Sequence, residues 1–236
     1  MKKSLYIKNS DRDKKLITWG IGAILIVCAV LFFLFFGSKK EVWFCDEIYT
    51  FQSANGMEQG WPDATKGKWI SAEEMEAFFA ADSKELSLKW ISDSLYNDHV
   101  PLYFWLYRVV AFFLFKGSAT LWTGYCINLL FYIIFLGIAY KFFCDLTSRP
   151  LISAGIVLVS SIINRVMLAQ TTILRMYMML VLAELLLLLI GFKLVKDKDQ
   201  GKLKATTFLG LFVFSVFGLL THYDYWIFYA VTAAVF

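Results

Sequence analysis

Charged residues, prolines, cysteines and histidines are all scarce in this chain of 236 residues. Only 18% of the residues are charged, and the chain has three Pro, four Cys and two His. So few prolines exclude a collagen-like chain, and so few cysteines, without metal-type spacing, exclude a disulfide-stapled secreted module. An apolar content of 59% excludes a disordered chain and is atypical of a soluble enzyme. Nucleic-acid binding would need a basic stripe, which the sequence lacks.

The apolar residues are concentrated in long runs. Residues 16–36 and 121–140 contain no charged residue, and residues 171–192 contain two. At about 1.5 Å per residue in a helix, each run can cross roughly 30 Å of hydrocarbon. The sequence therefore predicts an all-α, multi-pass integral membrane helical bundle.

The distribution of charge predicts how the bundle is oriented. Residues 1–15 hold six basic residues against two acids, whereas residues 37–99 hold 12 acids against six lysines. Under the positive-inside rule, residues 1–15 form a basic cytoplasmic tail, and the long loop 37–100 lies outside a plasma membrane. The first apolar run is too long for a signal peptide, so we expect an uncleaved helix.

The long outer loop has helix signals of its own. Ser71-Ala-Glu-Glu74 matches a capping box, and Ser87 precedes a second apolar-periodic stretch. We expect short amphipathic helices on the membrane surface. Three tryptophans would anchor them at the interface: Trp61, Trp69 and Trp90.

The later segments follow from a Lys-rich stretch, 193–204, which we expect to be cytoplasmic. A helix over 171–192 then begins outside, with Arg175 in its first turn, and the helices 151–169 and 121–143 precede it with alternating direction. This leaves residues 101–116 with both ends outside, as a re-entrant or steeply tilted helix. A short true crossing is the alternative, because the segment is apolar all round except for Arg108. The apolar helix after residue 225 is unfinished at residue 236, so we expect a longer chain.

This topology places several ionisable residues at the outer membrane face. They are Asp46, Glu47, His99, Arg175 and His222, with Arg165 near the outer end of the preceding helix. An acid, a base and a cation at one membrane boundary suit an enzyme that acts on a membrane-anchored anionic substrate.

Each of these residues also has a structural interpretation. Asp46 and Glu47 are compatible with solvated acids or with a helix N-terminal pair. His99 is compatible with a helix cap, and His222 with a hydrogen-bonded interfacial histidine. Arg175 is either snorkelling to the interface or clamping a phosphate with its planar fork.

Four stretches resemble motifs of one superfamily, in the same order. Trp43-Phe44-Cys45-Asp46-Glu47-Ile48-Tyr49-Thr50 is similar to Trp-Phe-Asp-Glu-Ala-Tyr-Ser in the first outer loop of GT-C type glycosyltransferases that use polyprenyl-phosphate-linked sugars. This superfamily includes the protein O-mannosyltransferases and the aminoarabinose lipid A transferases. The other stretches are Asp98-His99-Val100-Pro101-Leu102-Tyr103 (His-Pro-Pro-Leu-Tyr), Leu174-Arg175-Met176-Tyr177 (Ala-Arg-Met-Tyr) and Leu220-Thr221-His222-Tyr223 (Thr-His-Tyr).

The resemblance covers about residues 15–236 and implies the N-terminal half of such an enzyme. It implies that Asp46 is the catalytic carboxylate that activates an acceptor hydroxyl, assisted by Glu47, in an inverting transfer. The implied substrate-binding residues are His99, Arg165, Arg175, Tyr177, His222 and Tyr223. Some relatives use a divalent cation and others do not, and this sequence has no dedicated ligand cluster.

The sequence thus predicts a membrane glycosyltransferase with a polyprenyl-phospho-sugar donor. Its acceptor is a protein, a lipid or a glycan, and nucleic acid is not expected as a partner. Two alternatives remain: a non-catalytic membrane protein of the same fold that binds lipid or a partner, and a transporter, which needs paired charges near the bilayer midplane.

Overall fold

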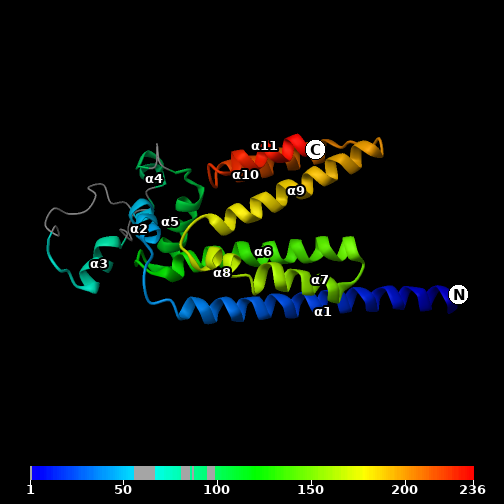
Figure 1. Cartoon of the computed structure of the whole chain (residues 1–236), viewed down its shortest axis with the longest axis horizontal. Helices are drawn as coiled ribbons and strands as arrows, with labels where there is room; N and C mark the ends of the chain where they lie inside the picture. The colour runs from blue at the N-terminus through cyan, green and yellow to red at the C-terminus, as the bar shows by residue number, and fades with distance from the viewer. Residues whose placement is uncertain (1, 56–66, 81–85, 87, 95–98) are drawn as a thin grey trace.

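The computed structural model describes residues 2–55, 67–80, 86, 88–94 and 99–236, and every regular element in these ranges is helical, which confirms the all-α class (Figure 1). In chain order the helices are α1 (Lys2–Ser38), α2 (Cys45–Asn55), α3 (Ala72–Phe79), α4 (Leu88–Ser94), α5 (Leu102–Phe115), α6 (Leu121–Thr147), α7 (Pro150–Val157), the π-helical turn η2 (Leu158–Ile162), α8 (Arg165–Thr172), α9 (Tyr177–Asp199), α10 (Ala205–Leu219) and α11 (Tyr225–Val235).

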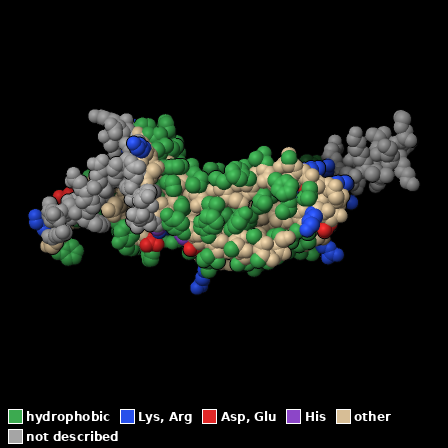
Figure 2. All heavy atoms as spheres, turned by 90° about the horizontal axis from the view of Figure 1, so that it is seen from above, with side chains coloured by type: hydrophobic (Ala, Val, Ile, Leu, Met, Phe, Trp, Pro, Cys, Tyr) green, Lys and Arg blue, Asp and Glu red, His purple; other side chains and the backbone are tan. Residues whose placement is uncertain are grey.

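Three helices in the described part of the chain are long and apolar enough to cross a membrane. They are Asp13–Ser38 of α1, α6 and α9. α7 with η2, followed by α8 after a 61° bend, makes a fourth candidate if the two parts form one span. On the face that Figure 2 shows, hydrophobic side chains cover much of the middle of the molecule, and most charged side chains lie toward its two ends. The structure therefore contains three helices that could span a membrane, as expected. The N-terminal basic segment is helical as well and forms the first turns of α1.

Helix α6 is central to the bundle, because α1, α5, α7 and α9 all pack against it. Two tyrosines of α6 fix its neighbours through backbone carbonyls. Tyr140 donates its hydroxyl to Thr18 O in α1 at 3.0 Å, and Tyr132 donates to Ser161 O in η2 at 3.0 Å. Hydrogen bonds to carbonyls suit an apolar setting, in which an unpaired polar group is costly.

Helices α9 and α10 form a hairpin that a polar triangle closes. Lys193 Nζ donates to Thr207 Oγ1 at 2.6 Å and to Asp197 Oδ2 at 3.2 Å, and Thr207 Oγ1 donates to Asp197 Oδ2 at 2.8 Å. α11 then folds back, and Tyr225 donates its hydroxyl to Phe214 O at 3.2 Å.

The opposite end of the bundle carries α2, α3, α4 and α5, and we call it the α2–α5 end (Figure 1). The capping box of α3 is confirmed, since the Ser71 side chain accepts from Glu74 N–H and the Glu74 carboxylate accepts from Ser71 N–H. Trp69 is fully exposed. Trp61, Ser87 and the side chain of Trp90 lie outside the described residues.

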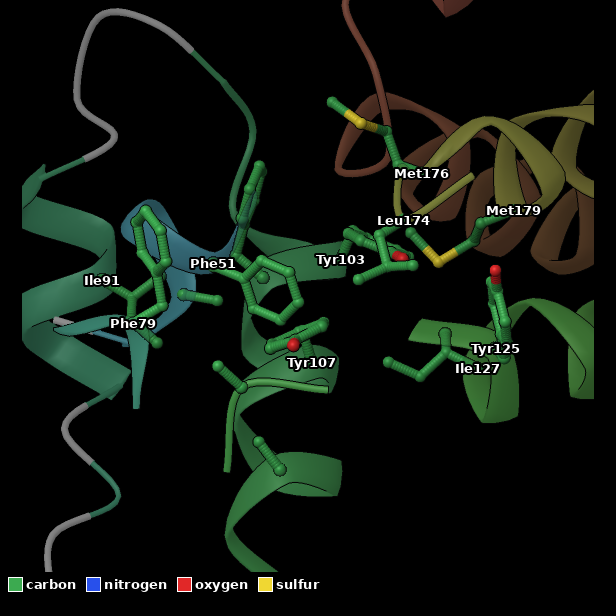
Figure 3. Packing of buried hydrophobic residues seen from close by; sticks show 14 of the residues in the cluster. Phe51, Phe79, Ile91, Tyr103, Tyr107, Tyr125, Ile127, Leu174, Met176 and Met179 are labelled. Atoms are coloured by element: carbon green, nitrogen blue, oxygen red, sulfur yellow. The ribbon is translucent and has the colours of Figure 1, made fainter. Parts of the chain in front are cut away.

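A hydrophobic cluster joins the short helices of this end to the long ones. Aromatic rings from α2, α3 and α5 pack on one side, and residues around the start of α9 pack on the other, as Figure 3 shows. The cluster includes Phe51, Phe79, Tyr103, Tyr107, Tyr125, Leu174, Met176 and Met179. The short helices are therefore packed against the bundle itself.

Helix α5 begins and ends at this same end of the bundle. Its first residue, Leu102, donates its N–H to Leu220 O at the end of α10. α5 leads directly into α6, whose first turns lie against Gly37, near the end of α1, and against Leu174. These contacts favour a helix that does not cross the bundle.

One expected helix start is wrong. Residues 171–176 do not form the start of α9, because α8 ends at Thr172 and α9 begins only at Tyr177. Arg175 therefore lies in an irregular connection rather than in the first turn of a span. The reason is tertiary, since side chains from distant elements bind the backbone of this connection.

Candidate functional site

Asp46 and Glu47 occupy the first turn of α2. Acidic residues are favoured there because the partial positive charge of a helix N-terminus attracts them. The two neighbours are nevertheless in different environments: the Asp46 side chain is 38% exposed, whereas that of Glu47 is fully buried. Adjacent positions on a helix point about 100° apart, so one can face solvent while the other faces the bundle.

Both carboxylate oxygens of Glu47 have partners. Oε2 accepts the N–H of Phe44 at 2.7 Å, and Oε1 accepts the N–H of Leu174 at 2.9 Å. Oε1 also pairs with Lys40 Nζ, which in turn donates to Thr172 O at 3.1 Å. Glu47 thus connects the start of α2 to the α8–α9 connection.

Two more side chains bind the same connection. Thr50 Oγ1 donates to Leu174 O at 2.7 Å, and Asn128 Nδ2 of α6 donates to Thr171 O at 3.2 Å and to Ile173 O at 2.6 Å. Backbone groups that a helix would satisfy internally are here satisfied by side chains. The irregular backbone before Arg175 is consequently held in one place.

Arg175 is the centre of the site, because it approaches two of the other candidate residues. Its side chain is 7% exposed, and its Nε lies 4.0 Å from Asp46 Oδ2. Nη1 lies 3.5 Å from the Asp46 carbonyl oxygen, and Nη2 lies 3.4 Å from His99 Nε2. Asp46, His99 and Arg175, far apart in sequence, are therefore brought together as expected.

One donor of Arg175 is left without an acceptor. Its buried Nε has no hydrogen-bond partner among the residues that the structure describes. A buried donor without a partner is costly, and guanidinium N–H groups match phosphate and carboxylate oxygens. The nearest described carboxylate oxygen to this Nε is Asp46 Oδ2, at 4.0 Å, which is too far for a hydrogen bond.

His99 precedes α5 and is held against it. Its ring stacks on Phe104 with centroids 5.7 Å apart. Because a guanidinium only donates hydrogen bonds, His99 Nε2 must act as the acceptor in its contact with Arg175. His99 thus takes part in the same cluster as Asp46 and Arg175.

His222 and Tyr177 form the other side of this region, with ring centroids 5.9 Å apart. The N–H of Asp224 donates to His222 Nδ1 at 3.0 Å, so the neutral ring carries its proton on Nε2. Burial lowers the pKa of His222, as does the positive charge of Arg175, although Asp224 acts in the opposite direction. His222 is therefore set up as a neutral Nε2–H donor.

Two expected substrate-binding residues do not join this cluster. Arg165 is exposed at the first position of α8, and Tyr223 is 47% exposed in the turn before α11. Neither side chain makes a hydrogen bond or ion pair with the described part of the site. Their role stays a prediction.

Sequence patterns gave no role to Lys40, Asn128 or Thr50, although Thr50 ends the first of the four quoted motifs. Lys40 is one of six lysines in the loop 37–99, and Asn128 is the one amide side chain of the apolar helix α6. A polar side chain inside an apolar span is a usable signal, because it must find a partner within the protein. Asn128 shows this directly, since it binds two carbonyls.

No group of three or more His, Cys, Asp or Glu side chains is placed to hold a metal ion within the described ranges. At Asp46 the nearest described neighbours include the Arg175 cation, which repels a metal ion. These residues do not fit a divalent cation.

Comparison with protein-family models, with curated proteins and with solved structures finds no match for the chain.

Proposed function

We propose that the chain is an integral-membrane glycosyltransferase of the GT-C type, which transfers a sugar from a polyprenyl-phosphate-linked donor to an acceptor at the outer face of the plasma membrane. One observation carries the proposal: the buried Arg175, whose Nε has no hydrogen-bond partner among the described residues, lies 4.0 Å from the partly exposed Asp46 carboxylate at one end of an apolar helical bundle.

The proposed reaction uses these two residues in different roles. The Asp46 carboxylate accepts the proton of an acceptor hydroxyl, and the acceptor oxygen attacks the anomeric carbon of the sugar. The bond between that carbon and the phosphate oxygen breaks on the opposite side, which inverts the configuration. Because the base and the leaving phosphate lie on opposite sides of the sugar, the bound donor must separate Arg175 Nε from Asp46 Oδ2, which are 4.0 Å apart in this structure. Arg175 then stabilises the negative charge that grows on the lipid phosphate.

The two histidines support the same chemistry. His99 orients Arg175 through the 3.4 Å contact with Nη2. His222, neutral and protonated on Nε2, offers a second donor to the phosphate oxygens without bringing in a proton that would neutralise Asp46. Glu47 acts through backbone groups, since both of its oxygens are engaged.

The test is sugar transfer by the full chain in lipid nanodiscs, using radiolabelled polyprenyl-phospho-sugars. Asp46→Asn keeps the size of the side chain but removes the base, and we expect transfer to fall by about 10²- to 10⁴-fold. Asp145→Asn is the matched control, because Asp145 is an exposed acid in the last turns of α6. Unchanged transfer in Asp46→Asn would refute the assignment.

The broken helix formed by α7, η2 and α8 favours a second candidate, a transporter. Transporters place irregular backbone where it lines a substrate path. A transporter moves its substrate without breaking the bond between sugar and phosphate. Uptake of intact polyprenyl-phospho-sugar into proteoliposomes, with no free lipid phosphate formed, would favour this candidate.

A further inference from the structure

Lys40 and Glu47 form an ion pair, and both side chains also bind the backbone of residues 172–174, which is more than 120 residues away in the sequence. Lys40 Nζ contacts Glu47 Oε1 and also donates to Thr172 O, and Glu47 Oε1 accepts the N–H of Leu174. Lys40 lies just after α1, and Glu47 lies in α2. One ammonium group therefore binds both the acid and the backbone that this acid holds.

The geometry makes Glu47 dependent on Lys40. Glu47 is fully buried, while Lys40 keeps 22% of its side chain exposed. A buried carboxylate is tolerated only when it is paired and hydrogen-bonded. Without the ammonium, Glu47 would keep two backbone N–H donors but no cation, so its hold on Leu174 N–H would weaken.

The segment that this pair holds ends at Arg175. Leu174 is fixed at its N–H by Glu47 and at its carbonyl by Thr50, and its side chain is fully buried. The next residue, Arg175, must place its guanidinium within 4.0 Å of Asp46 and 3.4 Å of His99. A shift of about 1 Å in such a group is enough to impair catalysis.

We propose that Lys40 is a positioning residue for Arg175. Lys40 acts through Glu47 and the carbonyl of Thr172, and so fixes the backbone from 172 to 175. This inference rests on the proposed function only for the role of Arg175 as the ligand of the donor phosphate. The mechanical part, in which Lys40 orders the connection, stands on the contacts alone.

The experiment compares Lys40→Met with Lys39→Met in the full chain in nanodiscs. Lys39 is an exposed neighbour, so its replacement removes the same charge without touching Glu47. Hydrogen–deuterium exchange of a peptide covering 171–176 reports on how firmly Lys40 and Glu47 hold this backbone. We expect Lys40→Met to speed this exchange by about tenfold or more, and Lys39→Met and Lys40→Arg to leave it unchanged.

The second readout is the kinetics of sugar transfer. We expect Lys40→Met to raise KM for the lipid-phosphate donor and to lower kcat, with the acceptor KM unchanged, and Lys40→Arg to restore both values. If Lys40→Met exchanges faster but its kinetics are unaltered, Lys40 does not position Arg175. If its exchange is unaltered, Lys40 does not hold the backbone of residues 172–175. If the wild type shows no transfer at all, the proposed function fails, while the exchange result still decides whether Lys40 holds this backbone.

Thr50→Val covers the case in which Lys40→Met does not fold. It removes the hydroxyl that holds Leu174 O and keeps the shape of the side chain. We expect it to speed exchange of the same peptide and to raise the donor KM in the same direction. Exchange and kinetics equal to wild type would contradict the view that the anchoring of this backbone positions Arg175.

Discussion

Gly124 of α6 and Leu174 of the α8–α9 connection touch so closely that no side chain fits between them. A Cβ added at Gly124 would lie 2.5 Å from Leu174 Cγ and 3.2 Å from the Tyr103 hydroxyl. Such a distance is too short for carbon atoms in contact, so one of the two segments would have to move. The position of Arg175 therefore depends on a missing methyl group in another helix.

Gly124→Ala should destabilise the protein by about 1–3 kcal/mol, because overpacking forces the buried Leu174 out of its place. The thermal unfolding midpoint in detergent measures this, and transfer activity should fall with it. Gly137→Ala is the matched control in the same helix, since no atom lies within 4 Å of a Cβ there. Equal midpoints for the two variants would contradict the close packing at Gly124.

Arg175→Lys should keep a positive charge but lose the planar fork that matches phosphate. We expect kcat/KM for the lipid-phosphate donor to fall by about 10- to 100-fold, as for one charge-assisted hydrogen bond. In Arg175→Ala this kcat/KM should fall further, and the KM for the acceptor should stay constant in both variants. Arg149→Ala is a control, because Arg149 is exposed before α7. A defect confined to the acceptor would refute the phosphate role.

His222 should make the protein less stable in mild acid. Burial lowers its pKa below the ordinary value of 6.5, so the folded state favours the neutral ring. Its contribution is therefore present above pH 6.5 and is lost as the pH falls through the lowered value. The groups that face it are Tyr177, Asp224 and Arg175.

His222→Gln keeps a donor near the position of Nε2 but does not titrate. Unfolding midpoints measured between pH 7 and pH 5 should therefore fall less steeply in His222→Gln than in the wild type. Parallel pH curves for the two proteins would show that His222 does not contribute.

The two ends of α5 should be accessible from the same side of the membrane. Ser118→Cys, placed between α5 and α6, should react with a membrane-impermeant thiol reagent applied outside intact cells, in a background in which the native cysteines are replaced. Labelling only after the membrane is permeabilised would show that α5 crosses.

Local sequence patterns were enough for much of the fold. Long apolar runs identified the three candidate spans, and the Ser71–Glu74 pattern identified the start of α3 because a capping box involves only residues three positions apart. The alternating helix directions inferred from charge also predicted that Asp46, His99 and Arg175 lie at one end of the bundle. The helix start near residue 171 was wrong because apolar periodicity continues through the connection, while Asn128, Thr50 and Glu47 bind its backbone from other elements.

The sequence by itself determined that this protein is helical, apolar and charged toward its ends, because hydropathy, charge and capping are properties of neighbouring residues. Only the tertiary structure decided that the Asp46 side chain is partly exposed while that of Glu47 is buried. It also decided that Arg175 lies between two helices, where its guanidinium approaches both Asp46 and His99. The physical reason is that these outcomes depend on hydrogen bonds between groups more than 40 residues apart, which buried side chains make only after the helices have packed.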